Sequence, residues 1–145
     1  MTPLGAEQSD VRWKQRFDNL QRALRQLEAA VEAHEAMPTN ELIVIALIKA
    51  YEFSFELSWK TLKDLLAWNG IDAKLPREVI KQAFATGLVE HGQLWIDMLE
   101  QRNLMTHTYD QARAAEATRL ITDHYLAALQ WLRQSLIQRL EEETP

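Results

Sequence analysis

The stretch "LIVIALIKAYEFSFELSWKTLKDLLAW", from Leu42 to Trp68, decides the fold class of this chain. Its apolar residues recur at intervals of three and four, which is the period of an α-helix. Asn40 or Thr39 can cap the start of this helix, and Gly70 suits the left-handed conformation that often ends one. Because the first part of the stretch is apolar on all sides, we expect it to lie at the centre of a bundle or in an interface.

Helical periodicity covers most of the remaining sequence, and the few glycines and prolines separate the periodic segments. We expect three further long helices at about residues 10–36, 91–106 and 110–140. A short helix is expected at about residues 76–87, between a proline and a glycine. The sequence therefore predicts an all-α fold, an antiparallel up-and-down helical bundle of four long helices plus one short helix.

The chain has 145 residues, which is enough to bury one core without disulfides or metals. No repeat or long linker divides it, so we expect a single domain, residues 10–141, after a disordered N-terminal tail, residues 1–9. The sequence contains no cysteine, no signal-peptide pattern and no apolar run of transmembrane length, and we therefore expect a cytoplasmic protein. The net charge of −5 argues against a broad surface for nucleic-acid phosphates.

A narrow charged stripe runs along the helix that starts at Leu42, with apolar residues on both flanks. It consists of Lys49, Glu52, Glu56, Lys60 and Lys63. In one interpretation the stripe is a solvated ladder, in which Glu56 and Lys60 attract each other weakly at a spacing of four. In the other interpretation, Glu52 and Glu56 face a buried cation elsewhere in the bundle.

Arg102 is the candidate for that cation, because it lies within the apolar face of its own expected helix. The face is formed by Trp95, Met98, Leu99 and Met105. A buried guanidinium without a partner is costly, so we expect Arg102 to face a carboxylate, an interface or a cleft. Glu52 and Glu56 are possible partners, and such an ion pair could simply hold two helices in register.

Arg102 stands at the start of the polar segment "RNLMTHTYDQ", residues 102–111. Arg102 and His107 would point roughly 140° apart in a straight helix, so they could not converge there on one small ligand. Either the helix ends between them, or a second copy of the protein completes the site. A break is compatible with the sequence, because Thr108, in a capping box with Gln111, or Asp110 could start a new helix.

After such a break, His107 and Tyr109 would stand at a helix N-terminus, where free backbone N–H groups bind anions such as phosphate. Asn103, four residues before His107, could orient the imidazole ring. A histidine can accept the proton of an RNA 2′-hydroxyl or protonate the leaving oxygen, and an arginine can neutralise charge on the phosphate. These residue types would permit RNA cleavage without a metal if a dimer doubled the site into a cleft.

The other histidines do not suggest a metal site. His34, His91 and His124 lack a partner at metal-ligand spacing, and we expect neither a metal ion nor a cofactor. His124 is expected to be a half-buried helix residue. The chain also lacks a glycine-rich phosphate loop and the strand-borne aspartates that a nucleotidyltransferase needs, so it is not expected to be a transferase itself.

Three segments carry a family resemblance. "YEFSFELSWKTLKDLL", "PREVIKQAFATGLV" and "WIDMLEQRNLMTHTYD" resemble, in this order, the nucleotidyltransferase substrate-binding (HepT-like) subfamily of small bacterial HEPN-domain proteins. Within the third segment, "RNLMTHTY" fits the R-x4-H-x-Y motif of HEPN domains. The resemblance extends from about Ala46 to the end of the last helix. Leu75 departs from it, because relatives often carry a capping serine there, but this difference concerns only a helix start.

The resemblance implies a homodimer that forms a complex with a minimal nucleotidyltransferase encoded by a neighbouring gene. In many such pairs the HEPN protein resembles a toxin, a metal-independent endoribonuclease, and the transferase acts as its antitoxin. Arg102 and His107 would then be catalytic, with Asn103 in support. Tyr109 would be a possible site of adenylylation or nucleotide binding. The alternative is a non-catalytic nucleotide- or substrate-binding subunit of a nucleotidyltransferase complex, which the acidic net charge favours.

Overall fold

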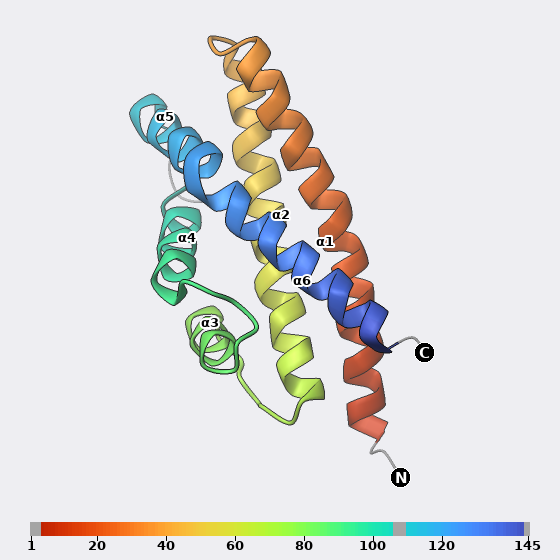
Figure 1. Cartoon of the computed structure of the whole chain (residues 1–145). Coiled ribbons are helices and arrows are strands. Elements are labelled where there is room, and N and C mark those ends of the chain that lie inside the picture. Colours follow the sequence, from red (N-terminus) through yellow and green to blue (C-terminus); the bar gives the residue numbers. More distant parts are fainter. Residues whose placement is uncertain (1–3, 106–109, 144–145) are drawn as a thin grey trace.

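The computed structural model describes residues 4–105 and 110–143, and these residues form helices and short connections (Figure 1). The helices are α1 (Leu4–Ala36), α2 (Glu41–Trp68), α3 (Pro76–Ala85), α4 (Gly92–Met105), α5 (Gln111–Leu120) and α6 (Leu126–Glu143), and the π-helical segment η1 (Ile121–Tyr125) joins the last two. The prediction of an all-α helical bundle is confirmed. No helix in the described ranges combines the length and the apolar character needed to cross a membrane.

The helix ends agree well with the local sequence signals. The side chain of Asn40 caps α2 by accepting a hydrogen bond of 3.2 Å from the backbone N–H of Ile43. Gly70 follows α2 with a φ of +87°, a conformation that residues with a Cβ rarely adopt. Helix α3 starts with Pro76, and Leu75 caps it without any side-chain hydrogen bond.

Helix α1 begins at Leu4, which is earlier than the expected start at about Asp10. Asp10 does not cap the helix, because its carboxylate faces residues of the following turn. It accepts hydrogen bonds of 2.9 Å from the indole of Trp13 and 3.0 Å from Lys14. The expected N-terminal tail, residues 1–9, is therefore helical from residue 4 onward.

The long antiparallel hairpin of α1 and α2 is the scaffold of the bundle (Figure 1). Helix α6 crosses this hairpin obliquely, while α3 and α4 lie along one side of α2. Two ion pairs hold α6 on α1: Arg133 Nη1 lies 2.6 Å from Glu28, and Lys14 Nζ lies 3.0 Å from Glu143. The last helix thus ends beside the first turns of α1.

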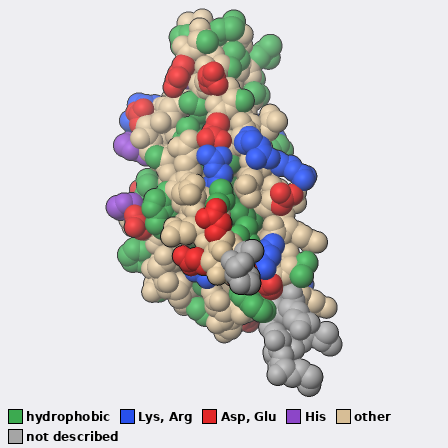
Figure 2. Space-filling view, turned by 45° about the vertical axis from the view of Figure 1, so that its right-hand side comes forward, with side chains coloured by type: hydrophobic (Ala, Val, Ile, Leu, Met, Phe, Trp, Pro, Cys, Tyr) green, Lys and Arg blue, Asp and Glu red, His purple; other side chains and the backbone are tan. Residues whose placement is uncertain are grey.

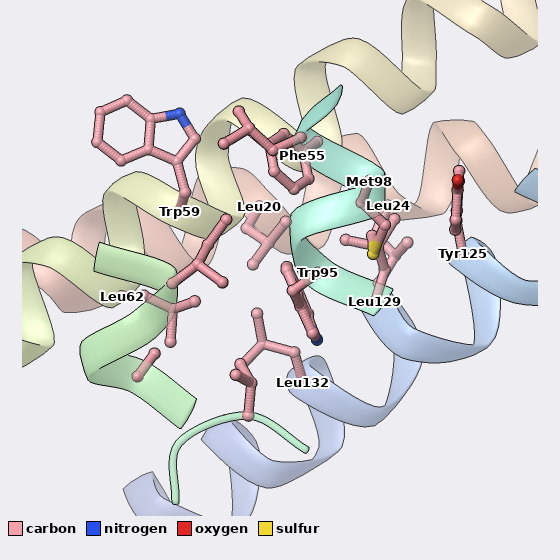
Figure 3. Close-up of a cluster of buried hydrophobic side chains, with 14 of the residues drawn as sticks. Leu20, Leu24, Phe55, Trp59, Leu62, Trp95, Met98, Tyr125, Leu129 and Leu132 are labelled. Carbon is pink, nitrogen blue, oxygen red and sulfur yellow. The ribbon is translucent and has the colours of Figure 1, made fainter. Parts of the chain in front are cut away.

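The core lies where α1, α2, α4 and α6 meet (Figure 3). All six apolar positions that alternate by four and three along α1 are buried: Trp13, Phe17, Leu20, Leu24, Leu27 and Val31. Aromatic rings join the other helices. Phe55 of α2 and Trp95 of α4 have ring centroids 6.1 Å apart, and Tyr51 stacks on Tyr125 at 5.6 Å.

The last helix, expected to be continuous, contains a π-helical segment at Ile121–Tyr125. The apolar positions around it explain this difference. Ala117, Ile121, Tyr125 and Leu129 are all buried although they follow each other at a constant spacing of four. In a regular α-helix each such step overshoots a full turn by about 40°, so the wider π turn brings these side chains back to one face.

The first turns of α2 lie at the surface of the chain and not at the centre of the bundle. Leu42 is 77% exposed, Ile45 47% and Phe53 56%. We call Leu42, Ile45 and Phe53 the α2 apolar face. On a helical wheel they fall within about 80° of one another, together with Glu56. Lys49 lies among these side chains, with its Nζ 5.4 Å from the centroid of the Phe53 ring, so the face carries one cation as well. Exposed large apolar side chains gathered on one side of a helix are typical of an interaction site.

Candidate active site

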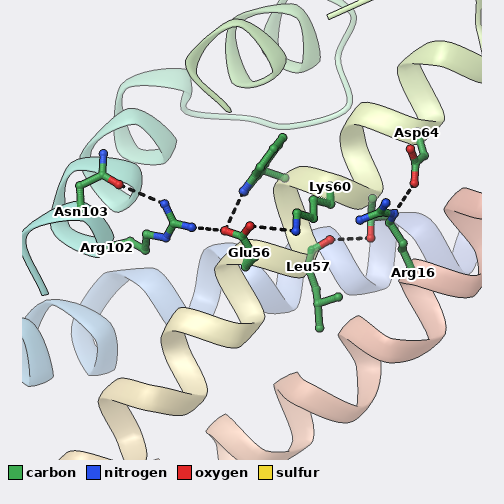
Figure 4. A network of polar contacts seen from close by, with 9 residues as sticks. Arg16, Glu56, Leu57, Lys60, Asp64, Arg102 and Asn103 are labelled. Carbon is green, nitrogen blue, oxygen red and sulfur yellow. Dashed lines mark hydrogen bonds and ion pairs between the residues drawn. The ribbon is translucent and has the colours of Figure 1, made fainter. Parts of the chain in front are cut away.

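Arg102 in the last turn of α4 forms an ion pair with Glu56 of α2 (Figure 4). Trp95, Met98 and Leu99 are buried and fix α4 against the core. Since Arg102 follows Met98 by four residues, its side chain lies on the same side of the helix, toward α2. The Arg102 side chain is 24% exposed and the Glu56 side chain 28%, so the pair is partly open to solvent.

Glu56 is the centre of a small polar network. Its carboxylate accepts a hydrogen bond of 3.0 Å from the indole of Trp59 and makes a 3.0 Å ion pair with Lys60, besides contacting Arg102. Burial alone would raise the pKa of Glu56, but the hydrogen bonds from Trp59 and Lys60 and the charge of Arg102 leave it below its ordinary value. Glu56 is therefore a negative charge at neutral pH.

The other residues expected around Arg102 divide into two groups. Asn103 accepts a hydrogen bond of 3.1 Å from Arg102 Nη1, so it touches the guanidinium directly. Glu52 contacts Lys49 at 3.4 Å. Of the two carboxylates considered as partners, Glu56 is thus the one in contact with Arg102.

The remaining motif residues, His107 and Tyr109, lie outside the described residues, as does Thr108. Helix α4 ends at Met105 on one side of them, and α5 begins on the other with Asp110 as its cap. The Asp110 carboxylate accepts a hydrogen bond of 2.8 Å from the N–H of Ala112. The helix that carries Arg102 is thus separate from α5.

A cavity of about 320 Å³ opens between α4 and α5, beside the turn that carries Arg102. Its lining includes Gln101 and Leu104 from α4 and Arg113 and Glu116 from α5. Arg113 makes no ion pair within the described part of the chain, whereas Arg119 is engaged with Glu116 at 2.6 Å. Arg113 is therefore a second cation close to the Arg102 turn.

The charge on the surface is mixed. Figure 2 shows acidic and basic side chains interspersed over one face, without a continuous basic area. Together with the net charge of −5, this distribution would confine any contact with nucleic-acid phosphates to local sites.

The structure brings together two histidines that are far apart in the sequence and that no spacing rule would pair. His91 and His124 line one cavity, between the start of α4 and the π-helical segment. His124 is exposed, in contrast to the expected half-buried position, because the cavity lies open beside it. His34 lies in the last turn of α1. Among the described residues no cluster of three or more potential metal ligands is found.

A family model described as "Nucleotidyltransferase substrate binding protein like" matches residues 15–138. The match covers the bundle from α1 to α6, including α4 and Arg102. The chain belongs to this family of nucleotidyltransferase substrate-binding-like proteins.

Similar proteins come from two bacteria. A probable ribonuclease HepT of Haemophilus influenzae is 29% identical over 105 residues, which span 69% of this chain and 71% of the relative. The structure of HI0074 from Haemophilus influenzae, described as the fold of a substrate binding domain of a nucleotidyltransferase, matches with a TM-score of 0.72 and 25% identity over 83% of this chain and 98% of the other. A crystal structure of a Thermus thermophilus protein matches with a TM-score of 0.57 and 26% identity over 79% of this chain and 98% of the other.

Proposed function

We propose that this protein is a metal-independent endoribonuclease and the toxin of a toxin–antitoxin pair. In this reaction the 2′-oxygen of a ribose attacks the adjacent phosphorus and the bond to the 5′-oxygen breaks. The products carry a 2′,3′-cyclic phosphate and a 5′-hydroxyl. His107 accepts the 2′-hydroxyl proton or donates one to the leaving oxygen, and Arg102 neutralises the charge that develops on the phosphate.

The observation that carries the proposal is the position of Arg102. Its guanidinium is a partly exposed cation held at the end of α4, directly before the segment that contains His107 and Tyr109. Because Glu56 and Asn103 already hold the guanidinium of Arg102 in place, the side chain loses little conformational entropy when it binds an oxyanion. The similarity to a probable ribonuclease HepT supports the same assignment.

A homodimer is part of this proposal. The α2 apolar face leads along the helix directly to Glu56, and therefore to Arg102. Leu104, two residues after Arg102, is 50% exposed. A second copy packed on these side chains would remove them from water and would bring the Arg102 turns of the two copies close together. His107 of each copy could then transfer protons in the shared cleft.

The partner in this proposal is a minimal nucleotidyltransferase from a neighbouring gene. The family description supports such a partner. The Tyr109 hydroxyl would attack the α-phosphorus of an ATP molecule bound to this transferase, and pyrophosphate would leave. The phosphate of the added adenylate would occupy the anion position that RNA needs. Modification would thereby silence the nuclease.

A second function, non-catalytic nucleotide or substrate binding for a transferase, is favoured by one observation. Glu56 and Asn103 already occupy the guanidinium of Arg102, as in an ion pair that serves to hold α4 on α2. In that case Arg102 is a structural or ligand-binding cation, and the transferase partner carries the chemistry.

The deciding experiment is incubation of the purified protein with mixed RNA in EDTA, after intact mass has shown that Tyr109 is unmodified. We expect cleavage by the wild type, with 2′,3′-cyclic phosphate ends, and at least a hundredfold loss in His107→Ala, since general acid–base catalysis is worth about 10²–10⁴-fold. Arg102→Ala should lose activity to a similar degree.

Arg77→Ala is a matched control, because Arg77 also pairs with a glutamate of another helix, Glu100, at 3.2 Å. It should cleave like the wild type. Absence of cleavage by unmodified wild-type protein would overturn the nuclease proposal and leave the binding subunit.

A further inference from the structure

A second cavity, of about 230 Å³, lies at the opposite end of α4 from Arg102. Leu94, Trp95, Ala127 and Ala128 give it mainly apolar walls, and the indole of Trp131, which is 38% exposed, lines it as well. A cavity of this size admits one flat ring system more readily than a drug-sized molecule, for which pockets of about 300–1,000 Å³ are usual.

Three polar side chains surround the cavity: Glu90, His91 and His124. Each is exposed, and none makes a hydrogen bond or an ion pair within the described part of the chain. They therefore offer a carboxylate acceptor and imidazole groups, which can donate or accept, to whatever enters the cavity.

The backbone around the cavity is unusual at two independent places. His91 has a φ of +57°, the only positive value at a non-glycine residue in the described ranges. His124 belongs to the π-helical segment. Left-handed non-glycine residues and single π turns are both energetically unfavourable, and both are enriched at functional sites.

We propose that this cavity is a binding site for a nucleobase that carries an exocyclic amino group. The base stacks on the indole of Trp131, and its amino group donates a hydrogen bond to the carboxylate of Glu90. His91 and His124 contact the remaining edge of the ring. Stacking on an aromatic side chain suits every base, while a carboxylate opposite the exocyclic position accepts from an amino group there and disfavours the carbonyl oxygen that inosine and uridine carry instead.

The charge of the site separates it from the Arg102 site. The cavity lining contains a carboxylate but no lysine or arginine, so a phosphate would be repelled from the interior and must point outward to solvent. Gly92 and Arg102 are ten residues apart on α4, which corresponds to roughly 15 Å along the axis. The site is thus additional to the proposed nuclease site and does not depend on it.

The test is nuclear magnetic resonance of the five tryptophan indole N–H groups during titration with nucleosides. Adenosine is compared with inosine, and cytidine with uridine, because each pair differs in the amino group. We expect adenosine and cytidine to shift the Trp131 signal, which Trp131→Leu identifies, and inosine and uridine to bind several times more weakly. In the His107→Ala background, in which RNA is not cleaved, a short oligoadenylate that binds more tightly than adenosine, with an advantage lost on adding Arg102→Ala, would identify an RNA strand as the source of the base.

Variants give the proposal a second check. Trp131→Leu should weaken adenosine binding about tenfold or more. Glu90→Ala should abolish the preference for adenosine over inosine. Trp68→Leu, which removes a partly buried indole outside the cavity, should bind like the wild type.

If no nucleoside shifts the Trp131 signal, or if adenosine and inosine bind equally, the proposal is wrong. Because the readout is binding at Trp131, neither outcome bears on RNA cleavage at Arg102. Failure of the nuclease experiment would in turn leave this site untouched.

Discussion

The hydroxyl of Tyr51 on α2 donates a hydrogen bond of 2.8 Å to the backbone carbonyl of Met98 on α4. The bond is buried, and Met98 lies one turn before Arg102. Burial raises the pKa of Tyr51 well above its ordinary value, so the phenol is protonated and acts as a donor at neutral pH. The helix that presents Arg102 is thus tied to α2 by a neutral polar bond as well as by the ion pair to Glu56.

Replacing Tyr51 by phenylalanine should therefore destabilise the bundle and loosen α4. We expect a loss of about 1–2 kcal/mol in the free energy of unfolding, since a buried hydrogen bond is removed with little change in volume. Urea unfolding measures the loss, and hydrogen exchange of the α4 amides shows where it acts. Tyr125→Phe is the control, because Tyr125 is equally buried but makes no side-chain hydrogen bond in the described ranges. Equal losses in the two variants would contradict the assignment.

Glu28 should make the stability of the protein depend on pH. Arg133 binds both carboxylate oxygens, and this bidentate contact lowers the pKa of Glu28 despite its partial burial. A carboxyl group whose pKa is lower in the folded state stabilises the protein at pH values above its pKa in the unfolded chain, which is about 4.3. This stabilisation is lost as the pH falls through the pKa of the folded state.

Glu28→Gln should consequently cost about 1 kcal/mol at pH 7 and almost nothing near pH 3. Urea midpoints of the wild type and the variant at both pH values give the comparison. Asp18→Asn, which removes an exposed pair with Arg22 within α1, should change stability by less than about 0.5 kcal/mol at either pH. A Glu28→Gln deficit that persists at pH 3 would show that charge is not its cause.

Phe53 should govern self-association if a second copy covers the α2 apolar face. Phe53→Asp would place a negative charge within that interface, while the folded monomer would tolerate it because the side chain is 56% exposed. Light scattering should give twice the chain mass of 16.8 kDa for the wild type and a single chain mass for Phe53→Asp.

Phe84→Asp makes the comparison specific. Phe84 is exposed to 55%, almost the same fraction, but lies on α3 and outside the α2 apolar face. It should leave the dimer intact. A monomeric wild type, or a dimer in both variants, would remove the second copy from the proposed nuclease site.

Glu56 should compete with phosphate for the guanidinium of Arg102. Glu56→Gln keeps an oxygen that can accept from the Trp59 indole but removes the negative charge beside Arg102. The affinity for RNA should therefore rise about two- to fivefold, which corresponds to the free energy of a partly exposed ion pair. Filter binding with non-cleavable 2′-deoxy substrate measures this change in the His107→Ala background. A fall in affinity would mean that Glu56 serves chiefly to hold Arg102 in place.

The sequence predicted the long elements well because their signals are local. Asn40, Pro76 and Gly70 act on their own turns, and the apolar positions of α1 alternate regularly, so helix ends and the buried face follow from neighbouring residues. The sequence signal for the π-helical segment is weaker than the signals for the helix ends. Only the constant spacing of four from Ala117 to Leu129 indicates it, and that pattern is easily taken for an ordinary apolar stripe.

Contacts between distant segments could not be read in the same way. The position of Arg102 within an apolar face predicted that it needs a partner. Whether that partner is Glu56 or Glu52 depends on the axial position of α4 relative to α2, which the sequence does not contain. The cavity at His91 and His124 was missed for the same reason. It exists only because α4 starts beside the π turn of a helix that comes much later in the chain.

The ion pair between Lys14 and Glu143 has a practical consequence for handling the protein. It brings the last turn of α6 beside the first turns of α1, and Figure 1 shows both ends of the described chain at the same end of the bundle. Glu56, the partner of Arg102, lies two turns of α2 away from Asp64, which pairs with Arg16 near that end. A dye, a bead or a fusion partner attached at either terminus would therefore leave the Arg102 site facing free solution, and immobilised protein should remain usable for RNA and partner binding.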